Sequence, residues 1–259
     1  MTASTQFDLT GKVAVITGGS RGIGKSIAHC FADAGASIVI ASRKQEGLDK
    51  AAKEIEKSGA SVLTVATHTG NDEAVQMLAS KTMDTFGAID IVINNAATNP
   101  YFGPLFGSDE SHWDKISQVN VKGYYKVANA CLKSMRDRGC GKIINVASIL
   151  GKIPASGMGI YSISKAAVIM LTKVMAQELA QDNIQVNAIA PGFVKTDFSR
   201  ALWQNERLHG AIIRQIPKGR MADPDEIGGI ALYLASSASD YTTGETIFVD
   251  GGQSLGPSI

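Results

Sequence analysis

Residues 13–24 read VAVITGGSRGIG: an apolar β-branched run, then a glycine-rich turn and the start of an amphipathic stretch. The run predicts a buried strand, and residues 22–34 have the periodicity of a helix. Gly18 allows a tight bend, Gly22 lets the backbone approach a pyrophosphate, and Gly24 lets helix and strand pack closely. Free amides and the helix dipole at this N-terminus attract phosphate. The unit is typical of dinucleotide-binding α/β proteins, although glycine-rich turns also occur for purely structural reasons.

The rest of the chain repeats this alternation of strand and helix. Six further strands are predicted from apolar runs at 36–42, 61–67, 89–94, 142–148, 184–190 and 245–250. Between the strands, helical patterns occur at about 44–57, 71–86, 109–138, 158–182 and 223–236. Near-continuous apolar runs indicate strands covered on both faces, as in a parallel sheet. We therefore predict one α/β domain over 1–259, a doubly wound sheet of seven parallel strands, because a closed barrel would need an eighth.

Composition excludes several classes of function. Of the 259 residues 44% are hydrophobic and 19% charged, and the net charge of +1 provides no field to attract nucleic acid or an anionic membrane. No apolar run approaches the roughly 20 residues of a membrane span, and the N-terminus MTASTQFDLTGK is unlike a signal peptide. The three cysteines lack the spacing of a metal site, so no metal is expected. A cytoplasmic protein without nucleic-acid or membrane partners is predicted.

A serine and a tyrosine–lysine pair supply candidate chemistry. Ser148 follows a predicted strand, and Tyr161 and Lys165 stand one helical turn apart in YSISK. A tyrosine pKa near 10 must fall by about three units for neutral acid–base work. An ammonium about 4 Å away supplies roughly 4 kcal/mol at an effective dielectric near 20, which is about enough. We therefore expect Lys165 to lower the pKa of Tyr161, although such a pair alone is more often a solvated helix face.

The end of the second predicted strand indicates the cofactor. It reads IASRK at 40–44, where an NAD-preferring site would carry Asp or Glu for the ribose hydroxyls. Ser42, Arg43 and Lys44 stand there instead, and Arg21 of the glycine loop could approach the same place. Forked guanidinium groups suit a 2′-phosphate, so NADP(H) is favoured. The alternative is that Arg43 and Lys44 only begin the exposed face of the next helix.

Together these motifs resemble the short-chain dehydrogenase/reductase family over roughly residues 8–252. The resemblance is carried by the glycine loop, Asn94-Asn95-Ala96, Asn120, Ser148, Tyr161, Lys165 and Pro191-Gly192. It implies a Rossmann sheet and a catalytic Asn-Ser-Tyr-Lys tetrad. Tyr161 would exchange a proton with the carbonyl oxygen, Ser148 would hold that oxygen, and Lys165 would lower the pKa of Tyr161 and hold the nicotinamide ribose. Asn120 would hold a water that links Lys165 to solvent.

The resemblance also implies a cofactor-binding set: Gly18, Ser20, Arg21, Gly22, Ile23, Gly24, Ser42, Arg43, Lys44, His68, Asn94, Ala96, Tyr161, Lys165, Pro191, Gly192, Val194 and Thr196. Asn94 would lie near the adenosine ribose, and Val194 and Thr196 at the nicotinamide or phosphate. Two positions depart from the family pattern. Ala97 stands where glycine is common and would be strained at positive φ. His68 stands where relatives often have Asp against the adenine amine, and imidazole lacks a carboxylate's charge.

Residues 191–221 form the longest segment without a predicted strand or helix, and such segments are often lids. We expect a substrate lid at about 192–215, the alternative being a surface excursion with its own small core. An apolar pocket is expected from Tyr101, Ile149, Ile153, Phe193, Phe198, Leu202 and Trp203, although the lid residues could simply pack on the body.

Three stretches, at 41–44, 95–100 and 195–203, look most like the NADP-dependent carbonyl and retinal reductase branch of the family. The resemblance therefore implies an NADPH-dependent reductase of ketones or aldehydes, reversible as an alcohol dehydrogenase, acting on a small-molecule substrate. A 3-oxoacyl-acyl-carrier-protein reductase is the alternative, and a non-catalytic NADP(H)-binding sensor or scaffold is the alternative of another class. The ending Asp250-Gly251-Gly252 resembles the segment through which many relatives form homotetramers.

Overall fold

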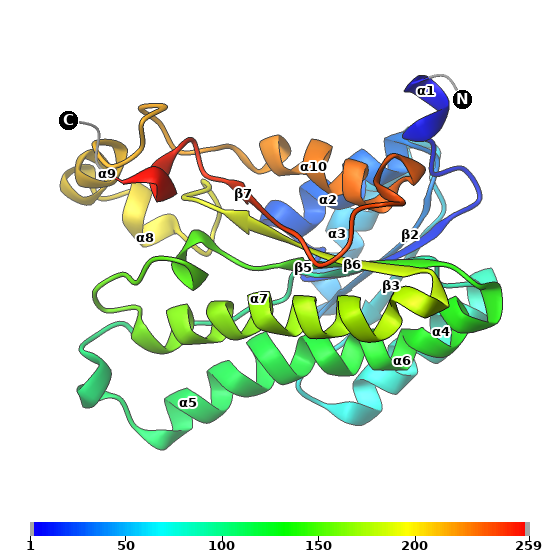
Figure 1. The fold of residues 1–259 in the computed structure, drawn as a ribbon, viewed down its shortest axis with the longest axis horizontal. Helices are drawn as coiled ribbons and strands as arrows, with labels where there is room; N and C mark the ends of the chain where they lie inside the picture. Colours follow the sequence, from blue (N-terminus) through cyan, green and yellow to red (C-terminus); the bar gives the residue numbers. More distant parts are fainter. Residues whose placement is uncertain (1–2, 257–259) are drawn as a thin grey trace.

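The computed structural model describes residues 3–256, and its centre is a seven-stranded parallel sheet (Figure 1). The strands are β1 (Val13–Thr17), β2 (Ser37–Ser42), β3 (Val62–Ala66), β4 (Ile91–Asn94), β5 (Gly141–Val146), β6 (Ile184–Pro191) and β7 (Thr246–Val249). Their order is β3-β2-β1-β4-β5-β6-β7, and every neighbouring pair is parallel. The predicted doubly wound α/β fold is confirmed, with strand ends that differ from the prediction by two residues at most.

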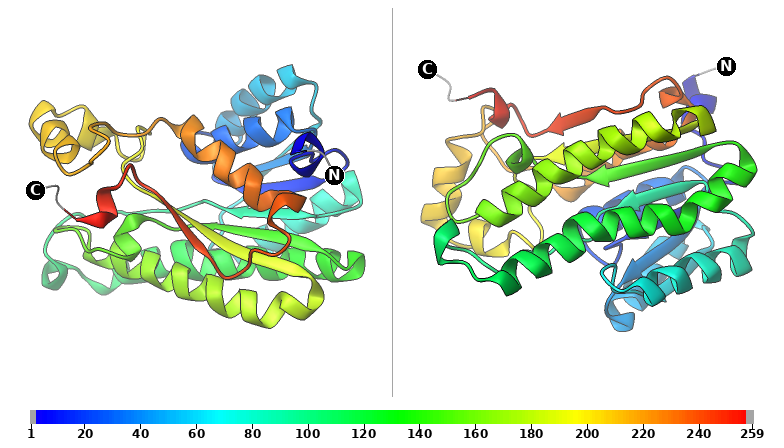
Figure 2. Two further views of the ribbon diagram at one scale, coloured as in Figure 1. Left: turned by 45° about the horizontal axis from the view of Figure 1, so that its top comes forward. Right: turned by 60° about the horizontal axis from the view of Figure 1, so that its bottom comes forward.

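Helices cover both faces of this sheet (Figures 1 and 2). One face carries α2 (Gly22–Asp33), α3 (Gln45–Ile55) and α10 (Gly228–Ala235), and the other carries α4 (Asp72–Phe86), α6 (Gly123–Arg138) and α7 (Gly159–Leu179). Side chains of β1 alternate between the two cores: Ile16 packs on the first face and Val15 on the second. Both cores therefore fix the strand register, and with it the positions of the strand ends.

The predicted helix at 109–138 is not continuous. α5 (Glu110–Ser117) passes into a π-helical turn, η3 (Gln118–Lys122), before α6 begins at Gly123. The apolar periodicity continues through the turn, which is why the sequence pattern does not reveal it. Single π turns inside α-helices are frequent at functional sites, and this one contains Asn120.

Shorter helices complete the chain. They are α1 (Ala3–Gln6), α8 (Arg200–Trp203) and α9 (Glu206–Ile213), with 3₁₀ turns η1 (Glu56–Ser58), η2 (Leu105–Gly107), η4 (Ile149–Gly151), η5 (Ala180–Asp182), η6 (Pro224–Ile227), η7 (Ser237–Ser239) and η8 (Gln253–Leu255). α8 and α9 lie in the segment predicted as the lid, beyond the carboxyl ends of the strands (Figure 1). α7 with its following turn is long and apolar enough to span a membrane by length and composition, but half of that window is buried in the fold, as in a core helix.

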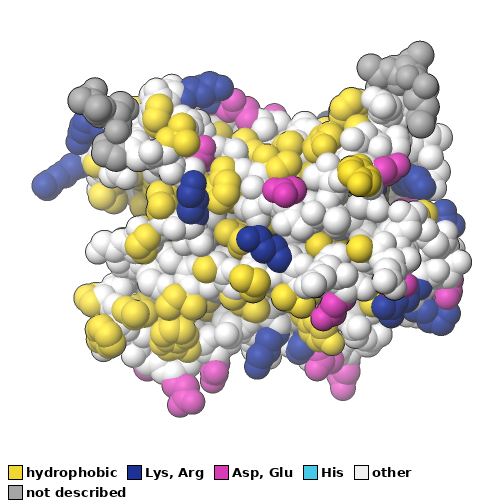
Figure 3. Space-filling view, in the orientation of Figure 1, with side chains coloured by type: hydrophobic (Ala, Val, Ile, Leu, Met, Phe, Trp, Pro, Cys, Tyr) yellow, Lys and Arg dark blue, Asp and Glu magenta, His cyan; other side chains and the backbone are white. Residues whose placement is uncertain are grey.

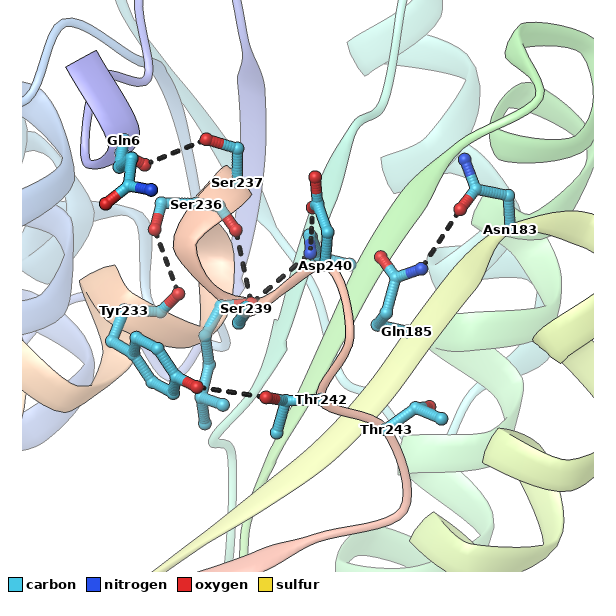
Figure 4. Close-up of polar contacts among 12 residues, drawn as sticks. Gln6, Asn183, Gln185, Tyr233, Ser236, Ser237, Ser239, Asp240, Thr242 and Thr243 are labelled. Carbon is cyan, nitrogen blue, oxygen red and sulfur yellow. Dashed lines mark hydrogen bonds and ion pairs between the residues drawn. The ribbon is translucent and has the colours of Figure 1, made fainter. Parts of the chain in front are cut away.

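The amino-terminal edge of the sheet is closed by small polar side chains (Figure 4). The Ser239 hydroxyl donates to Leu234 O at 3.0 Å, and the hydroxyls of Tyr233 and Thr242 lie 2.9 Å apart. Lys142, at the start of β5, donates to Asp240 at 2.8 Å. These hydrogen bonds hold the segment that leads into β7 against the start of β5. The candidate catalytic residues lie at the opposite, carboxyl edge of the sheet, where Ser148 follows β5.

Candidate active site

The glycine loop is shaped by contacts that leave no room for a Cβ. Gly18 has φ +68°, and a Cβ there would lie 2.6 Å from Asn95 Nδ2. A Cβ on Gly24 would lie 2.5 Å from the same Nδ2 and 2.5 Å from Gly18 O. Asn95 Nδ2 donates to Thr17 O at 3.0 Å, so this amide at the end of β4 fixes the loop. The first amides of α2 have no side-chain cap, which leaves them free for phosphate.

The turn after β4 is joined to β1 by one threonine. Thr17 Oγ1 accepts from Asn95 N at 2.9 Å and from Ala96 N at 3.1 Å, and donates to Ile93 O. Among the described residues Asn183 is the only non-glycine with positive φ, so Ala97 avoids the strain considered from the sequence. The loop thus accepts alanine where glycine is common.

Asn94 corrects a sequence expectation. Its side chain is fully buried, and Nδ2 donates to Tyr124 O at 3.1 Å and to Asn145 Oδ1 at 3.0 Å. The amide therefore joins β4 to α6 and β5 in the core, and the expectation that it lies near the adenosine ribose is wrong for the side chain. Motif position alone cannot tell which face of the strand such an amide occupies.

The groups expected to bind a 2′-phosphate lie on the surface. Arg43 and Lys44 are exposed at the end of β2 beside Ser42, and neither cation forms an ion pair within residues 3–256. Arg21 of the glycine loop instead contacts Asp197 at 3.4 Å, and Asp197 also pairs with Arg200 of α8. A methyl of Thr196 lies 3.2 Å from where a Gly22 Cβ would stand. The glycine loop and the lid segment therefore meet.

His68 is positioned by its own turn after β3. Its Nδ1 accepts from Gly70 N at 3.1 Å, so the ring proton is on Nε2. Burial lowers the pKa of His68, and the charges of Lys115 and Arg43 lower it further. The imidazole is therefore neutral at pH 7 and offers a single donor at the edge where adenine is expected.

Ser148, Tyr161 and Lys165 come together at the carboxyl end of β5, as the sequence predicts. Ser148 follows β5 and begins η4, where its Oγ accepts from Leu150 N at 3.1 Å. Tyr161 lies in the first turns of α7 and is buried, and its phenol interacts with the Ser148 hydroxyl. Lys165 Nζ lies 5.6 Å from the centroid of the Tyr161 ring.

The net lowering of the Tyr161 pKa that the sequence predicts is not found in this structure. Burial raises the pKa of the Tyr161 phenol, and the hydrogen bond with Ser148 lowers it only in part. Lys165 is itself only 1% exposed, and burial lowers its pKa to about 7. Its Nζ donates to Val146 O at 2.7 Å and to Tyr124 Oη at 3.2 Å, and it lies over the Tyr161 ring. A spacing of four residues fixes the shared helix face but not the burial.

Asn120 holds the loop that follows β4. It is fully buried in the π turn, where its Oδ1 accepts from Thr98 N at 2.8 Å and its Nδ2 donates to Thr98 O at 3.0 Å and to Ser164 Oγ at 3.1 Å. Thr98 and Ser164 thereby connect the loop after β4 to α7. The water-holding role implied by the family resemblance stays a prediction.

The lid segment has a core of its own. Ile212, Ile216 and Met221 form it, and the half-buried Phe193, Leu202 and Trp203 pack around them. Their predicted place in the lining of a substrate pocket stays a prediction. Trp203 Nε1 donates to Thr196 O at 3.0 Å. Phe198 behaves differently: it is 54% exposed, and its ring centroid lies 5.8 Å from that of Tyr161.

The other predicted pocket and cofactor residues lie around this edge. The Tyr101 hydroxyl donates to Pro104 O at 2.7 Å, and its ring packs on the ring of His112. Both contacts hold the Tyr101 side chain beside the loop before α5 and the first turn of that helix. Ile149 is buried directly after Ser148, and Ile153 is half-buried. Pro191 ends β6, a Gly192 Cβ would meet Asp250, and buried Val194 pairs with Ala222.

Three residues of the site were missed from the sequence. Asn95 stands inside the quoted turn, but its contact with two glycines depends on the β1–β4 pairing. Tyr124 stands one helical turn after Asn120 and contacts Lys165, and Asp197 pairs with Arg21. Their spacing in the sequence carries no recognisable motif, so only the fold brings them to the site.

Comparison with known proteins gives consistent matches over nearly the whole chain. A family model described as enoyl-(acyl carrier protein) reductase matches residues 18–254. The chain is 42% identical over 244 residues to dehydrogenase/reductase SDR family member 4 of Oryctolagus cuniculus, covering 94% of each protein. It is 36% identical over 246 residues to a 3-oxoacyl-acyl-carrier-protein reductase of Vibrio cholerae, covering 95% of this chain and 98% of that one.

Among solved structures, a gluconate 5-dehydrogenase from Burkholderia cenocepacia in complex with NADP and tartrate superposes with a TM-score of 0.94 at 36% identity. The alignment covers 98% of this chain and 99% of that one. With the parallel sheet and the glycine loop described above, these matches establish that the chain is an oxidoreductase-family protein and belongs to the short-chain dehydrogenase/reductase family.

Proposed function

We propose that the protein is an NADPH-dependent reductase of ketones or aldehydes, reversible as an alcohol dehydrogenase. The observation that carries the proposal is the meeting of Ser148, Tyr161 and Lys165 at the sheet edge that also carries the glycine loop. A proton donor and a nucleotide cradle at one edge are what carbonyl reduction requires.

The cofactor fits the residues present. Uncapped amides at the start of α2 suit a pyrophosphate. Arg43 and Lys44, which are exposed and form no ion pair within residues 3–256, suit a 2′-phosphate. Arg21 can join them only by leaving Asp197. When bound, NADPH supplies the hydride. Several related structures are described with NADP bound, which supports the same choice.

Tyr161 is the proton donor in this proposal. Because burial raises its pKa, the phenol keeps its proton at neutral pH and can donate it to a carbonyl oxygen. The Ser148 hydroxyl beside it would donate a hydrogen bond to the same oxygen as negative charge develops. A protonated Lys165, whose Nζ lies 5.6 Å from the centroid of the Tyr161 ring, would offset part of the rise in the Tyr161 pKa by stabilising the resulting phenolate, by roughly 3 kcal/mol at an effective dielectric of 20. Asn120 would maintain the loop and the proton route.

The substrate is proposed to be a medium or bulky apolar carbonyl compound. Phe198 reaches from the lid segment to the ring of Tyr161, and Ile149 and Ile153 follow Ser148. Apolar groups around one convergent polar cluster are typical of small-molecule sites. This favours the carbonyl reductase branch.

A second candidate is reduction of 3-oxoacyl groups on an acyl carrier protein. It is favoured by the 36% identity to the Vibrio cholerae reductase of that name and by the description of the matching family model. Both candidates use the same proposed tetrad, so the substrate distinguishes them.

The deciding experiment is a screen of ketones, aldehydes and 3-oxoacyl thioesters with NADPH and NADH side by side. We expect NADPH consumption with apolar carbonyl compounds, and loss of turnover in Tyr161→Phe with NADPH binding retained. Turnover of thioesters alone would favour the second candidate. Tight NADPH binding without turnover of any compound would favour a sensor or scaffold, and full activity of Tyr161→Phe would refute the mechanism.

We also propose a cytoplasmic homotetramer. Ile163, Met170 and Val174 are apolar and exposed along α7, as expected of a face that is covered by another subunit.

On the face drawn in Figure 3 the charges of both signs are dispersed, which argues against a nucleic-acid or anionic-lipid partner. Free Cys30, Cys131 and Cys140 suit a reducing compartment. Light scattering of the eluted protein tests the tetramer, and cell fractionation tests the location.

A further inference from the structure

Tyr124 is a buried phenol in contact with the candidate catalytic lysine. It lies in the first turn of α6 and is 1% exposed. Its Oη donates to Val146 O at 3.0 Å and accepts from Lys165 Nζ at 3.2 Å. Its backbone carbonyl accepts from Asn94 Nδ2, which ties this turn to β4. Hydrogen bonds therefore hold Tyr124 both at its backbone carbonyl and at its phenol oxygen.

Lys165 is enclosed by neutral groups. Of its three N–H donors one goes to Val146 O and one to Tyr124 Oη, and the ring centroids of Tyr124 and Tyr161 lie 5.2 and 5.6 Å from Nζ. The titratable groups that face it are Tyr124 from α6 and Tyr161 from α7, while β5 contributes only a carbonyl. Within residues 3–256 no carboxylate forms an ion pair with it. Two neutral oxygens and two rings thus replace water around the ammonium.

We propose that Tyr124 is a positioning residue for Lys165: its phenol oxygen, with the carbonyl of Val146, holds the ammonium against the ring of Tyr161 and favours the charged form of the lysine. The proposal deepens the proposed function and rests on it for its catalytic meaning. The third N–H remains free to act in the site. A carboxylate at the same place would cancel the lysine charge, whereas a phenol holds the cation and leaves its charge available.

The phenol of Tyr124 suits this role because it does not ionise itself. Burial raises its pKa well above the ordinary value. The phenol therefore keeps its proton, which it donates to Val146 O, and its oxygen accepts from Lys165. A hydrogen bond that is made to the charged form of a base raises the pKa of that base. Since burial lowers the pKa of Lys165 to about 7, a shift of one unit changes its charge at neutral pH.

The test is the titration of Lys165 in the full-length protein, followed by NMR with ¹³C-ε-labelled lysine. The resonance is assigned by its loss in Lys165→Met, and it should titrate near neutral pH, apart from the exposed lysines. In Tyr124→Phe, which keeps the ring, we expect its pKa to fall by about one unit. Tyr125→Phe is the matched control, since it removes a hydroxyl from the next residue, which is 54% exposed, and should leave the titration unchanged.

The same variants are assayed for carbonyl reduction across pH. In Tyr124→Phe the alkaline limb of the kcat/KM profile should move to lower pH by about the same amount, because Lys165 loses its proton earlier. An unchanged titration would overturn the proposal, whatever the activity. A shifted titration in a protein that reduces no carbonyl compound would uphold the contact and refute the proposed function. If Tyr124→Phe does not fold, Tyr124→Met fills most of the volume without an acceptor and carries the same expectation.

Discussion

The cofactor half and the reaction half of the sheet edge place their polar groups in opposite ways. At β1 and β2 the charged groups proposed for NADP(H), Arg21 and Arg43, are exposed. Around β5 and α7 the polar groups proposed for the reaction, Asn120 and Lys165, are buried and hydrogen bonded to backbone groups and hydroxyl oxygens. Exposed charge selects a ligand at little cost to folding, whereas buried charge opposes folding. Substitutions of the polar groups in the cofactor half should therefore change the free energy of unfolding little. Substitutions of those in the reaction half should change it more.

The strongest test of this contrast is Lys165→Met. We expect kcat/KM to fall by about 10³-fold, while the free energy of unfolding at pH 7 rises by about 2 kcal/mol because a buried amine is removed. The lysine binds a proton up to pH 10.5 when unfolded but only to about pH 7 when folded, so its own contribution to stability rises with pH between these values. The gain from methionine should therefore be largest below pH 7 and small near pH 10. Urea denaturation at both pH values measures it, and a variant less stable than wild type at pH 7 would break the comparison.

The exposed counterpart is Arg43→Glu. Reversing this charge should weaken NADPH binding by about 100-fold, because a charge-assisted contact to the 2′-phosphate is replaced by repulsion. NADH binding should change little, and the free energy of unfolding should stay within about 0.5 kcal/mol of wild type. Fluorescence titration with both nucleotides measures the effect, with Lys53→Glu on α3 as the control for surface charge. Equal losses for NADPH and NADH would contradict the phosphate-binding role.

Two amides allow the halves to be compared with one substitution. Asn120→Ala leaves Thr98 N and O without their partner in a buried site, and should lower the free energy of unfolding by about 2 kcal/mol. Asn95→Ala removes contacts to Thr17 O and Gly18 O in a half-buried site and should cost about 1 kcal/mol. We expect the first variant to lower kcat and the second to raise the Kd for NADPH. The contrast would fail if both changed the same kinetic constant to the same degree.

The smallest effect is expected from Phe198→Ala. Since Phe198 is exposed on the lid segment and faces Tyr161, its removal should raise KM for a bulky apolar carbonyl by about 5-fold without a change in Tm. Phe106→Ala removes the same side chain from a fully exposed position in η2 and should change neither quantity. If the two variants have the same KM, Phe198 does not contact the substrate.

The fold was predictable because its signals are local and repeated. Each strand of the sheet is a short apolar run, and the glycine spacing at 17–24 is a recognisable motif even though the contacts that require it, with Asn95, lie outside the turn. The interruption of 109–138 was not predictable, since one π turn inserts a residue without disturbing the apolar pattern. Its consequence, the burial of Asn120 against Thr98, was therefore also hidden.

The limits at the site have a common physical origin. The apolar character of Phe193 and Trp203 is compatible with a pocket lining or with packing on the body, and it does not reveal the lid core on which they pack. Motif position identified Asn94 but not the face of β4 on which its amide lies. Spacing placed Lys165 beside Tyr161, yet the direction of the pKa shifts depends on desolvation, which only the packed structure defines.

The contact of Asn95 with both Gly18 and Gly24 has a consequence for protein engineering. The pyrophosphate loop and the first residue after β4 form one unit, so a loop grafted from a relative must bring its own matching side chain at position 95. Residues 42–44 have no such dependence, because Arg43 and Lys44 make no ion pair in the described part of the chain. A library meant to convert the proposed coenzyme preference can thus be confined to three codons, with the loop left as it is.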